Sequence, residues 1–330
     1  MIFGRLGARR CFWLTAYSIV AFVALPQAAQ AEPSELPPNI GYNYNEIETP
    51  RIAGMGGAQR ALSNSISALF VNPANMAASR VYHLGALAQI WPEAKRQSYG
   101  AGAVDSIVSA SRVAGGLGAT YNLQDMDGIE RKWTDVRFAL AFPFSEQFLA
   151  GAAGRYMWLS QDGEGQLQSS PASEGLPDKD ILKSITFDLG VTVKPSPAFA
   201  ISVVGNNLSN PDHGFQPMSV GGGLGLTLGD FGLEGDVVSD FGSWDENTLR
   251  AMLGGEGLFA DHFAARLGYR FDQGAESHAI SGGVGYIDRA FDVDIAVRRT
   301  VEGDGATAIV FGFSYHLEAS GLTPSAGDTF

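Results

Sequence analysis

Strict alternation of apolar and polar side chains is the feature that most constrains the fold of this chain. In ITFDLGVTVK, residues 185–194, the odd positions hold Ile, Phe, Leu, Val and Val, and the even positions hold Thr, Asp, Gly, Thr and Lys. The same alternation recurs in residues 262–271, 291–298 and 307–317. Because successive side chains of a β-strand point to opposite faces, the pattern predicts strands whose two faces meet different environments.

Alternating segments of this kind fill the chain from residue 81 to residue 317. Fourteen of them are predicted, with starts near Val81, Arg96, Arg112, Lys132, Phe148, Leu182, Ala198, Gln216, Phe231, Thr248, His262, Ser277, Ala290 and Ala306. An even number of tilted strands of about 10 residues is typical of bacterial outer-membrane barrels. The polar face is also rich in glycine, which a sheet facing bulk water does not require. We therefore predict an all-β fold, a transmembrane β-barrel of about 14 antiparallel strands.

The connections between the segments alternate in length. Short links such as 144–147, 195–197 and 229–230 are separated mostly by longer polar ones such as 161–180 and 240–247. Outer-membrane barrels have short periplasmic turns and long extracellular loops. Aromatic residues near the connections predict two interfacial girdles: Phe142, Phe144, Phe148 and Phe259 near the short turns, and Trp91, Tyr121, Trp133 and Trp158 near the long loops.

The first 31 residues have the anatomy of a secretory signal. Three arginines precede the apolar run 12–25, and Ala29-Gln30-Ala31 is a small-residue cleavage site. We therefore predict that residues 1–31 are a signal peptide and that the mature protein is exported through the Sec route. A retained membrane helix, the alternative, needs about 20 apolar residues. The formal charge of −13 and the lack of a Lys/Arg cluster exclude nucleic acid as a partner.

A compact helical segment interrupts the chain before the first strand. It reads GMGGAQRALSNSISALFVNPANMA, residues 54–77. Its glycines allow a sharp turn, and its proline forces the preceding asparagine into an extended conformation that ends the helix. We take Gly54, Gly56, Gly57, Asn72, Pro73 and Ala74 as the motif of a plug inside the barrel. Glycine runs in the predicted strands mark close approach of another backbone, or alternatively permit the sheet to twist and bend.

This division predicts four parts of the chain: a signal peptide at 1–31, an N-terminal hatch inside the barrel at 32–79, the barrel at 80–318 and a tail at 319–330. Two groups of candidate site residues follow from it. Apolar contacts for a ligand are expected from Leu62, Ile66 and Phe70. Charges pointing into the lumen are expected from Asp188, Asp292, Asp294, Arg266, Arg270 and Arg298.

The motif at 54–77 and its place before the first strand resemble the FadL/TodX-type channels for hydrophobic compounds. In that family such a segment forms an N-terminal hatch inside a fourteen-stranded barrel. The neighbouring PorV-type barrels of secretion systems share the signature. The chain departs from the family pattern at Asn64 and Ser65, where an acidic pair is common, and at Asn75, where glycine is usual.

The resemblance implies a place in the outer membrane of a Gram-negative cell, among outer-membrane lipid, after insertion by the barrel-assembly machinery. It implies passive uptake of a small hydrophobic ligand, fatty-acid-like or aromatic, through a lumen closed by the hatch. The alternative is a non-conducting PorV-like binding or shuttle barrel of a protein secretion or surface-assembly system.

Motifs for catalysis and metal binding are incomplete in this sequence. The string GFSYH has His316 where a nucleophile elbow needs its second glycine. The acidic pair Asp125 and Asp127 is not followed by the further ligands of a calcium loop. We therefore predict a protein that is not an enzyme and uses no metal or other cofactor.

Overall fold

The computed structural model describes residues 46–107, 112–125, 128, 130–162, 179–211, 213–244 and 246–317. Within these residues the chain forms fourteen strands, listed here with their bounds: β1(Tyr82–Trp91), β2(Arg96–Asp105), β3(Ala114–Gln124), β4(Glu130–Pro143), β5(Phe148–Asp162), β6(Lys179–Ser196), β7(Phe199–Asn206), β8(Ser219–Leu228), β9(Phe231–Asp240), β10(Thr248–Phe259), β11(Phe263–Asp272), β12(Ser277–Ile287), β13(Phe291–Glu302) and β14(Thr307–His316). The predicted signal peptide at 1–31 and the tail at 319–330 lie outside the described residues.

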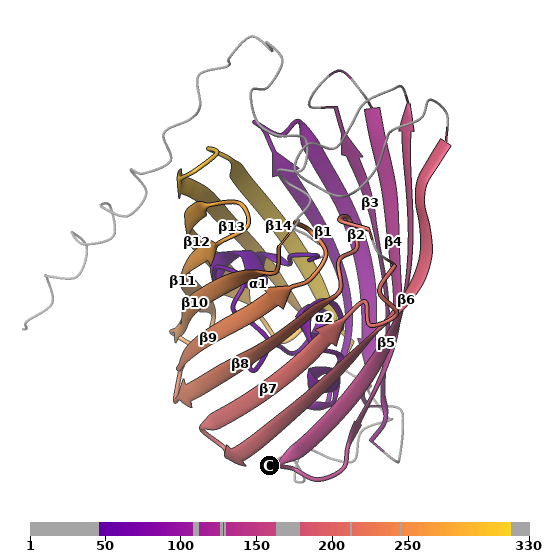
Figure 1. Cartoon of the computed structure of the whole chain (residues 1–330). Helices are drawn as coiled ribbons and strands as arrows, with labels where there is room; N and C mark the ends of the chain where they lie inside the picture. The colour runs from indigo at the N-terminus through magenta and orange to yellow at the C-terminus, as the bar shows by residue number, and fades with distance from the viewer. Residues whose placement is uncertain are drawn as a thin grey trace, which may run out of the picture. The chain divides into compact units, whose positions relative to one another are not determined.

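The strands form one closed antiparallel barrel (Figure 1). Each strand pairs with its neighbours in the chain, and β1 pairs with β14 from His83 opposite His316 to Ile90 opposite Ile309. The predicted fourteen-stranded antiparallel barrel is confirmed. The predicted strand starts lie within three residues of the observed ones, because the alternation of side chains is a local property of each strand.

The two faces of the strands differ as the alternation predicts. In β6, Ile185, Phe187 and Leu189 are exposed on the outer face, whereas Thr186 and Asp188 are buried on the inner face. The apolar outer face has the pattern of a barrel surface in contact with lipid. Within the described residues, no helix is both long and apolar enough to cross a membrane.

The predicted girdle near the long connections is correct for only two of its four aromatic residues. Tyr121 and Trp158 are 45% and 46% exposed on the outer face. Trp91 and Trp133 are buried instead, and Trp133 shares the inner face of β4 with Asp135. The assignment of Trp91 and Trp133 to the girdle was therefore wrong, because nearness to a loop does not determine the face on which a side chain lies.

Residues 46–79, called the hatch segment below, lie against the inner faces of the strands. They contain α1(Pro50–Gly54), α2(Ser65–Val71) and the 3₁₀ helix η2(Pro73–Ala77). Helix α1 contacts β11 to β14, whereas α2 contacts β1 to β4 and η2 contacts β3 to β6 (Figure 1). The short helices therefore touch both halves of the barrel.

Candidate functional site in the barrel lumen

The backbone of the hatch segment is bound by two carboxylates of β9. Asp236 Oδ2 accepts hydrogen bonds from the backbone N–H groups of Gln59 and Arg60, at 2.9 and 3.0 Å. Glu234 accepts from the backbone N–H groups of Ala61 and, at 2.9 Å, Leu62. Asp236 also pairs with Arg60 at 3.2 Å, and hydrogen bonds to a charged acceptor are about twice as strong as neutral ones. Residues 59–62 are therefore fixed to the barrel wall by their main chain.

Glycines shape the turn that leads to these bonds. Gly56 and Gly57 have φ of +69° and +95°, a region that favours glycine. A Cβ at Gly56 would lie 2.7 Å from the backbone nitrogen of Tyr269 in β11. The carbonyl of Gly54 accepts a hydrogen bond from Ser281 Oγ at 3.0 Å. The three motif glycines thus lie where the hatch segment passes close to the wall.

The Asn-Pro step ties the end of α2 to the middle of the hatch segment and to the wall. Asn72 Nδ2 donates to the Arg60 carbonyl at 2.7 Å and to Thr192 Oγ1 of β6 at 2.9 Å. Its Oδ1 accepts from the backbone N–H of Ala74 at 3.1 Å. Asn72 is extended, with φ −146° and ψ 100°, and Pro73 starts η2. Asn72 and Pro73 therefore have two roles, since they end α2 and also contact the barrel wall.

A carboxylate of the hatch segment lies among arginines. Glu46 pairs with Arg60 and Arg270 at 2.9 Å each, and with Arg250 at 3.9 Å. Burial disfavours the charged form of Glu46, but these three guanidinium groups outweigh burial and hold its pKa well below the ordinary value. Glu46 is therefore ionised at neutral pH and links the segment to β10 and β11.

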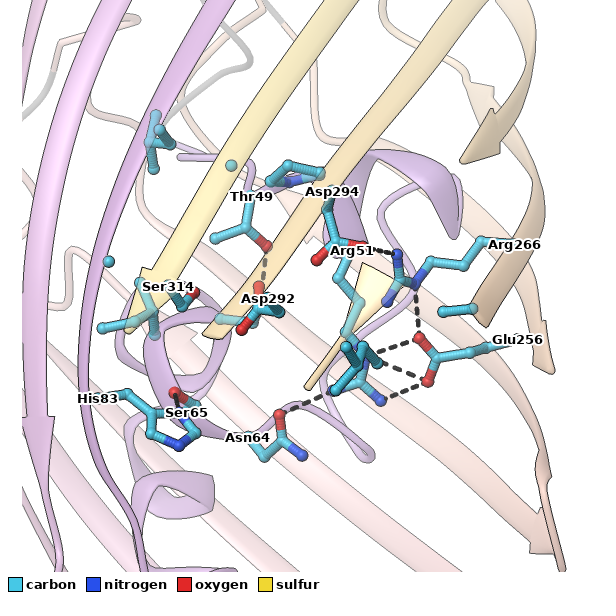
Figure 2. A pocket seen from close by; sticks show the side chains of 18 of the residues that line it. Thr49, Arg51, Asn64, Ser65, His83, Glu256, Arg266, Asp292, Asp294 and Ser314 are labelled. Atoms are coloured by element: carbon cyan, nitrogen blue, oxygen red, sulfur yellow. Dashed lines mark hydrogen bonds and ion pairs between the residues drawn. The ribbon is translucent and has the colours of Figure 1, made fainter. Parts of the chain in front are cut away.

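A second ion-pair chain runs along one cavity of the lumen (Figure 2). Arg51 of α1 pairs with Glu256 of β10 at 2.8 Å. Arg266 of β11 lies between Glu256, at 2.6 Å, and Asp294 of β13. The cavity has a volume of about 300 Å³ and lies near the short connections, with Leu258 and Ile287 in its lining.

The predicted lumen charges all lie on the inner faces of their strands. Arg266 and Asp294 belong to the chain just described, and Arg298 pairs with Glu48 of the hatch segment. Arg270 pairs with Glu46. Asp292 Oδ2 lies 2.8 Å from His316 Nε2. Arg270 and Arg298 thus pair directly with the hatch segment, whereas Arg266 and Asp294 reach it only through Glu256 and Arg51.

The sixth charge, Asp188, belongs to a separate inner network. It accepts from the backbone N–H of Asn207 at 2.7 Å and lies 3.8 Å from Arg137. Arg137 in turn approaches Asp135, which also binds Arg155. Within the described residues, no group of three or more His, Cys, Asp or Glu is arranged to hold a metal ion.

The three predicted apolar contacts pack against the inner wall. Phe70 is 3% exposed, and a Cβ at Gly118 would lie 3.0 Å from its ring. Ile66 is 7% exposed and borders the 300 Å³ cavity. Leu62 fills the space above Gly225 and borders a second cavity of about 390 Å³ near the short connections. Their role as ligand contacts stays a prediction.

An apolar cluster on the inner wall was missed by the sequence reasoning. Trp133, Met157, Leu159 and Leu182 come from β4, β5 and β6, and Phe215 comes from the β7–β8 connection. The Trp133 and Phe215 rings lie 6.3 Å apart between centroids. This cluster, called the apolar site below, lies near the long connections. The available signal was parity, since Trp133 shares its face with Asp135.

The segment that carries Phe215 folds back along the inner wall. Asn207, at the start of the connection, donates from Nδ2 to the Pro217 carbonyl at 2.9 Å and accepts from Thr186 Oγ1 at 2.8 Å. Gln216 Nε2 donates to Thr186 Oγ1 at 3.0 Å. These bonds hold the Phe215 ring over the apolar site, where the side chain is 4% exposed.

Comparisons with known proteins find likeness in structure only. No protein-family model matches the sequence, and a comparison with curated proteins finds no match. The toluene transporter TbuX of Ralstonia pickettii has a TM-score of 0.63 at 14% identity, covering 84% of this chain and 100% of TbuX. The toluene transporter TodX of Pseudomonas putida gives 0.58 at 12%, covering 82% and 98%. A FadL homologue of Pseudomonas aeruginosa gives 0.58 at 15%, covering 83% and 99%.

These structural matches, at 12–15% identity, show the fold alone. The resemblance predicted from residues 54–77 is confirmed at that level, and the chain has the barrel fold shared by the FadL/TodX-type hydrophobic-compound transport proteins.

Proposed function

We propose that this protein is an outer-membrane channel for passive uptake of small hydrophobic molecules, and that the hatch segment closes its lumen. The apolar site carries the proposal. The interior of an outer-membrane barrel is generally polar. A cluster of apolar side chains on the inner wall therefore indicates a specific role; its members on the strands are Trp133, Met157, Leu159 and Leu182. Binding sites for small molecules are lined mainly by hydrophobic and aromatic side chains, which is what this cluster supplies on the inner wall.

The order of the apolar site, the hatch segment and the two cavities along the lumen supports a transport route for a ligand. The apolar site lies near the long connections, which are extracellular in this class of barrel. The hatch segment follows, and the cavities of about 300 and 390 Å³ lie beyond it near the short connections. A hydrophobic molecule entering from outside would bind first at the apolar site and then pass the hatch segment toward the periplasm.

The closing role of the hatch segment rests on its contacts with the wall. Asp236 and Glu234 bind its main chain, and Glu46 and Arg51 pair with charges of the strands. The strands hydrogen-bond to one another around a closed ring, so the barrel does not need the segment to satisfy its own backbone. We therefore expect a barrel without residues 46–77 to assemble and to conduct ions.

The transport role is tested with a matched pair of tryptophans. Trp133 faces the lumen and Trp158 faces outward, on paired strands at nearly the same level. Trp133→Gln should slow uptake of labelled toluene by cells that express the protein, because it places a polar amide in the apolar site. Trp158→Gln should leave uptake unchanged, with heat-modifiable migration on gels confirming that both variants fold.

Two uptake results would contradict the channel proposal or the place of the apolar site in it. If expression of the wild-type barrel does not speed toluene or fatty-acid uptake at all, the channel proposal fails. Retention of a secreted protein at the long loops would then favour the shuttle function. If Trp133→Gln and Trp158→Gln slow uptake equally, the apolar site is not on the route.

A further inference from the structure

The Phe215 ring occupies the apolar site in the way that a bound molecule would. It is 4% exposed and packs against Trp133, Met157 and Leu182, although it comes from a connection rather than from the wall. The unfilled space beside it is a cavity of about 20 Å³, lined by Trp133, Met157 and Phe215 among others. That volume holds about one water molecule, so a ligand cannot enter while the ring is in place.

The segment that holds the ring is attached by polar contacts that are separate from the apolar site. Asn207 Nδ2 binds the Pro217 carbonyl at 2.9 Å, and Gln216 Nε2 binds Thr186 at 3.0 Å. The Phe215 backbone N–H donates to His213 Nδ1 at 3.2 Å. These bonds fix residues 207 and 213–217 to one another and to Thr186 of β6, and none of them is made by the Phe215 ring itself.

We propose that Phe215 is the specificity-determining residue of the channel: its ring occupies the apolar site until a ligand displaces it. This inference rests on the proposed function. A ligand that binds only when the ring is out has an apparent affinity reduced by the fraction of molecules in that state. The ligand that best replaces the Phe215 ring is one that fills the same volume, namely a single aromatic ring.

The floor of the apolar site supports the same ligand class. Asp135 lies directly opposite Met157, one inward step along β4 from Trp133, and pairs with Arg155 and Arg137 on the inner faces of β4 and β5. Arg96 covers the Trp133 ring, with its guanidinium carbon 5.0 Å from the centroid. A long acyl chain would have to bury methylene groups against these charges, at a cost in desolvation. A single ring, which takes the place that the Phe215 side chain fills, extends least over these charges.

The experiment measures binding of 4-fluorotoluene to purified full-length protein by ¹⁹F NMR titration. Phe215→Ala should raise the affinity about tenfold or more, because minor states are populated at about 0.1–10% and the variant removes the need to reach one. A fluorinated long-chain fatty acid should gain less. Phe144→Ala is the matched control, because Phe144 is exposed in a short turn at the other end of the barrel.

A second variant moves the ring without removing it. Asn207 has φ of +51°, which glycine adopts readily, so Asn207→Gly removes the side-chain bonds and keeps the backbone. It should also raise the affinity for 4-fluorotoluene, by a smaller factor than Phe215→Ala does.

Two outcomes would overturn the proposal. A lower affinity in Phe215→Ala would show that the ring is part of the wall that contacts ligand. Unchanged affinity in both variants would show that the ring does not compete with ligand. If instead the wild type and every variant fail to bind 4-fluorotoluene, and cells gain no uptake from the wild type, the proposed function itself fails.

Discussion

Asp236→Asn should loosen the hatch segment while leaving the barrel intact. The Asp236 side chain is wholly buried, and its Oδ2 accepts from two backbone N–H groups, at 2.9 and 3.0 Å, and from Arg60 Nη1 at 3.2 Å. Hydrogen bonds to charged groups contribute about 1.5–3 kcal/mol each and neutral ones about 1 kcal/mol. Loss of the charge therefore weakens each of the three bonds by about 1 kcal/mol, or about 3 kcal/mol if the losses add.

A loss of about 3 kcal/mol raises the ratio of open to closed molecules about 150-fold, since 1.4 kcal/mol is a factor of ten. The assay is conductance of single channels in planar lipid bilayers, with the open fraction measured over long recordings. Asp240→Asn is the control, because Asp240 lies on the same strand but binds Ser243 and Arg250 rather than the main chain of the hatch segment. An open fraction for Asp236→Asn equal to that of the wild type would refute the reasoning.

Three further predictions concern other parts of the barrel. Ile295→Arg, on the lipid-facing side of β13, should destabilise the protein by about 2–4 kcal/mol in urea unfolding from lipid vesicles, and Ser314→Arg, on the inner face, by much less; equal losses would contradict the assigned faces. The folded pKa of Glu46 lies below its unfolded value, so its stabilisation is complete above about pH 4.5 and is lost as pH falls through the lowered pKa. Acid should therefore raise the open fraction of the wild type more than that of Glu46→Gln, and identical pH profiles would exclude this role. Deletion of residues 319–330 should leave membrane insertion unchanged in a protease-protection assay, and failed insertion would show that the last strand was misplaced.

Strands and faces could be predicted because both are local properties. The side chains of β13 alternate residue by residue, so Asp292 and Asp294 were placed inward with no knowledge of their partners. The ion-pair partners of these residues could not be predicted in this way. Glu46 pairs with Arg270, which follows it by 224 residues, and no period in the sequence connects the two. The glycine runs of the strands were interpreted as sites of close approach, but the part of the chain that each one meets depends on the closed ring.

The apolar site was hidden for a different reason. Its wall residues follow strand parity, but Trp133 stands next to a long connection, and proximity suggested an interfacial role. Phe215 lies in a connection without periodic pattern, so its return into the lumen depends on the bonds of Asn207 and Gln216. Reading the face of each aromatic residue from its strand neighbours, rather than from its distance to a loop, would have identified the wall of the site but not the ring that fills it.

The contacts of the hatch segment also constrain the order of assembly. The segment is near the N-terminus, but Asp236, Glu256 and Arg270 lie far along the chain, and α1 packs mainly on β11 to β14. Contacts between residues distant in sequence form slowly, because the chain must first pay the entropy of closing a long loop. The surface that binds residues 46–60 is therefore complete only when β9 to β14 are in place. A barrel without its last strands would lack the groups that bind residues 46–60, so docking of this part of the hatch segment requires an almost complete barrel.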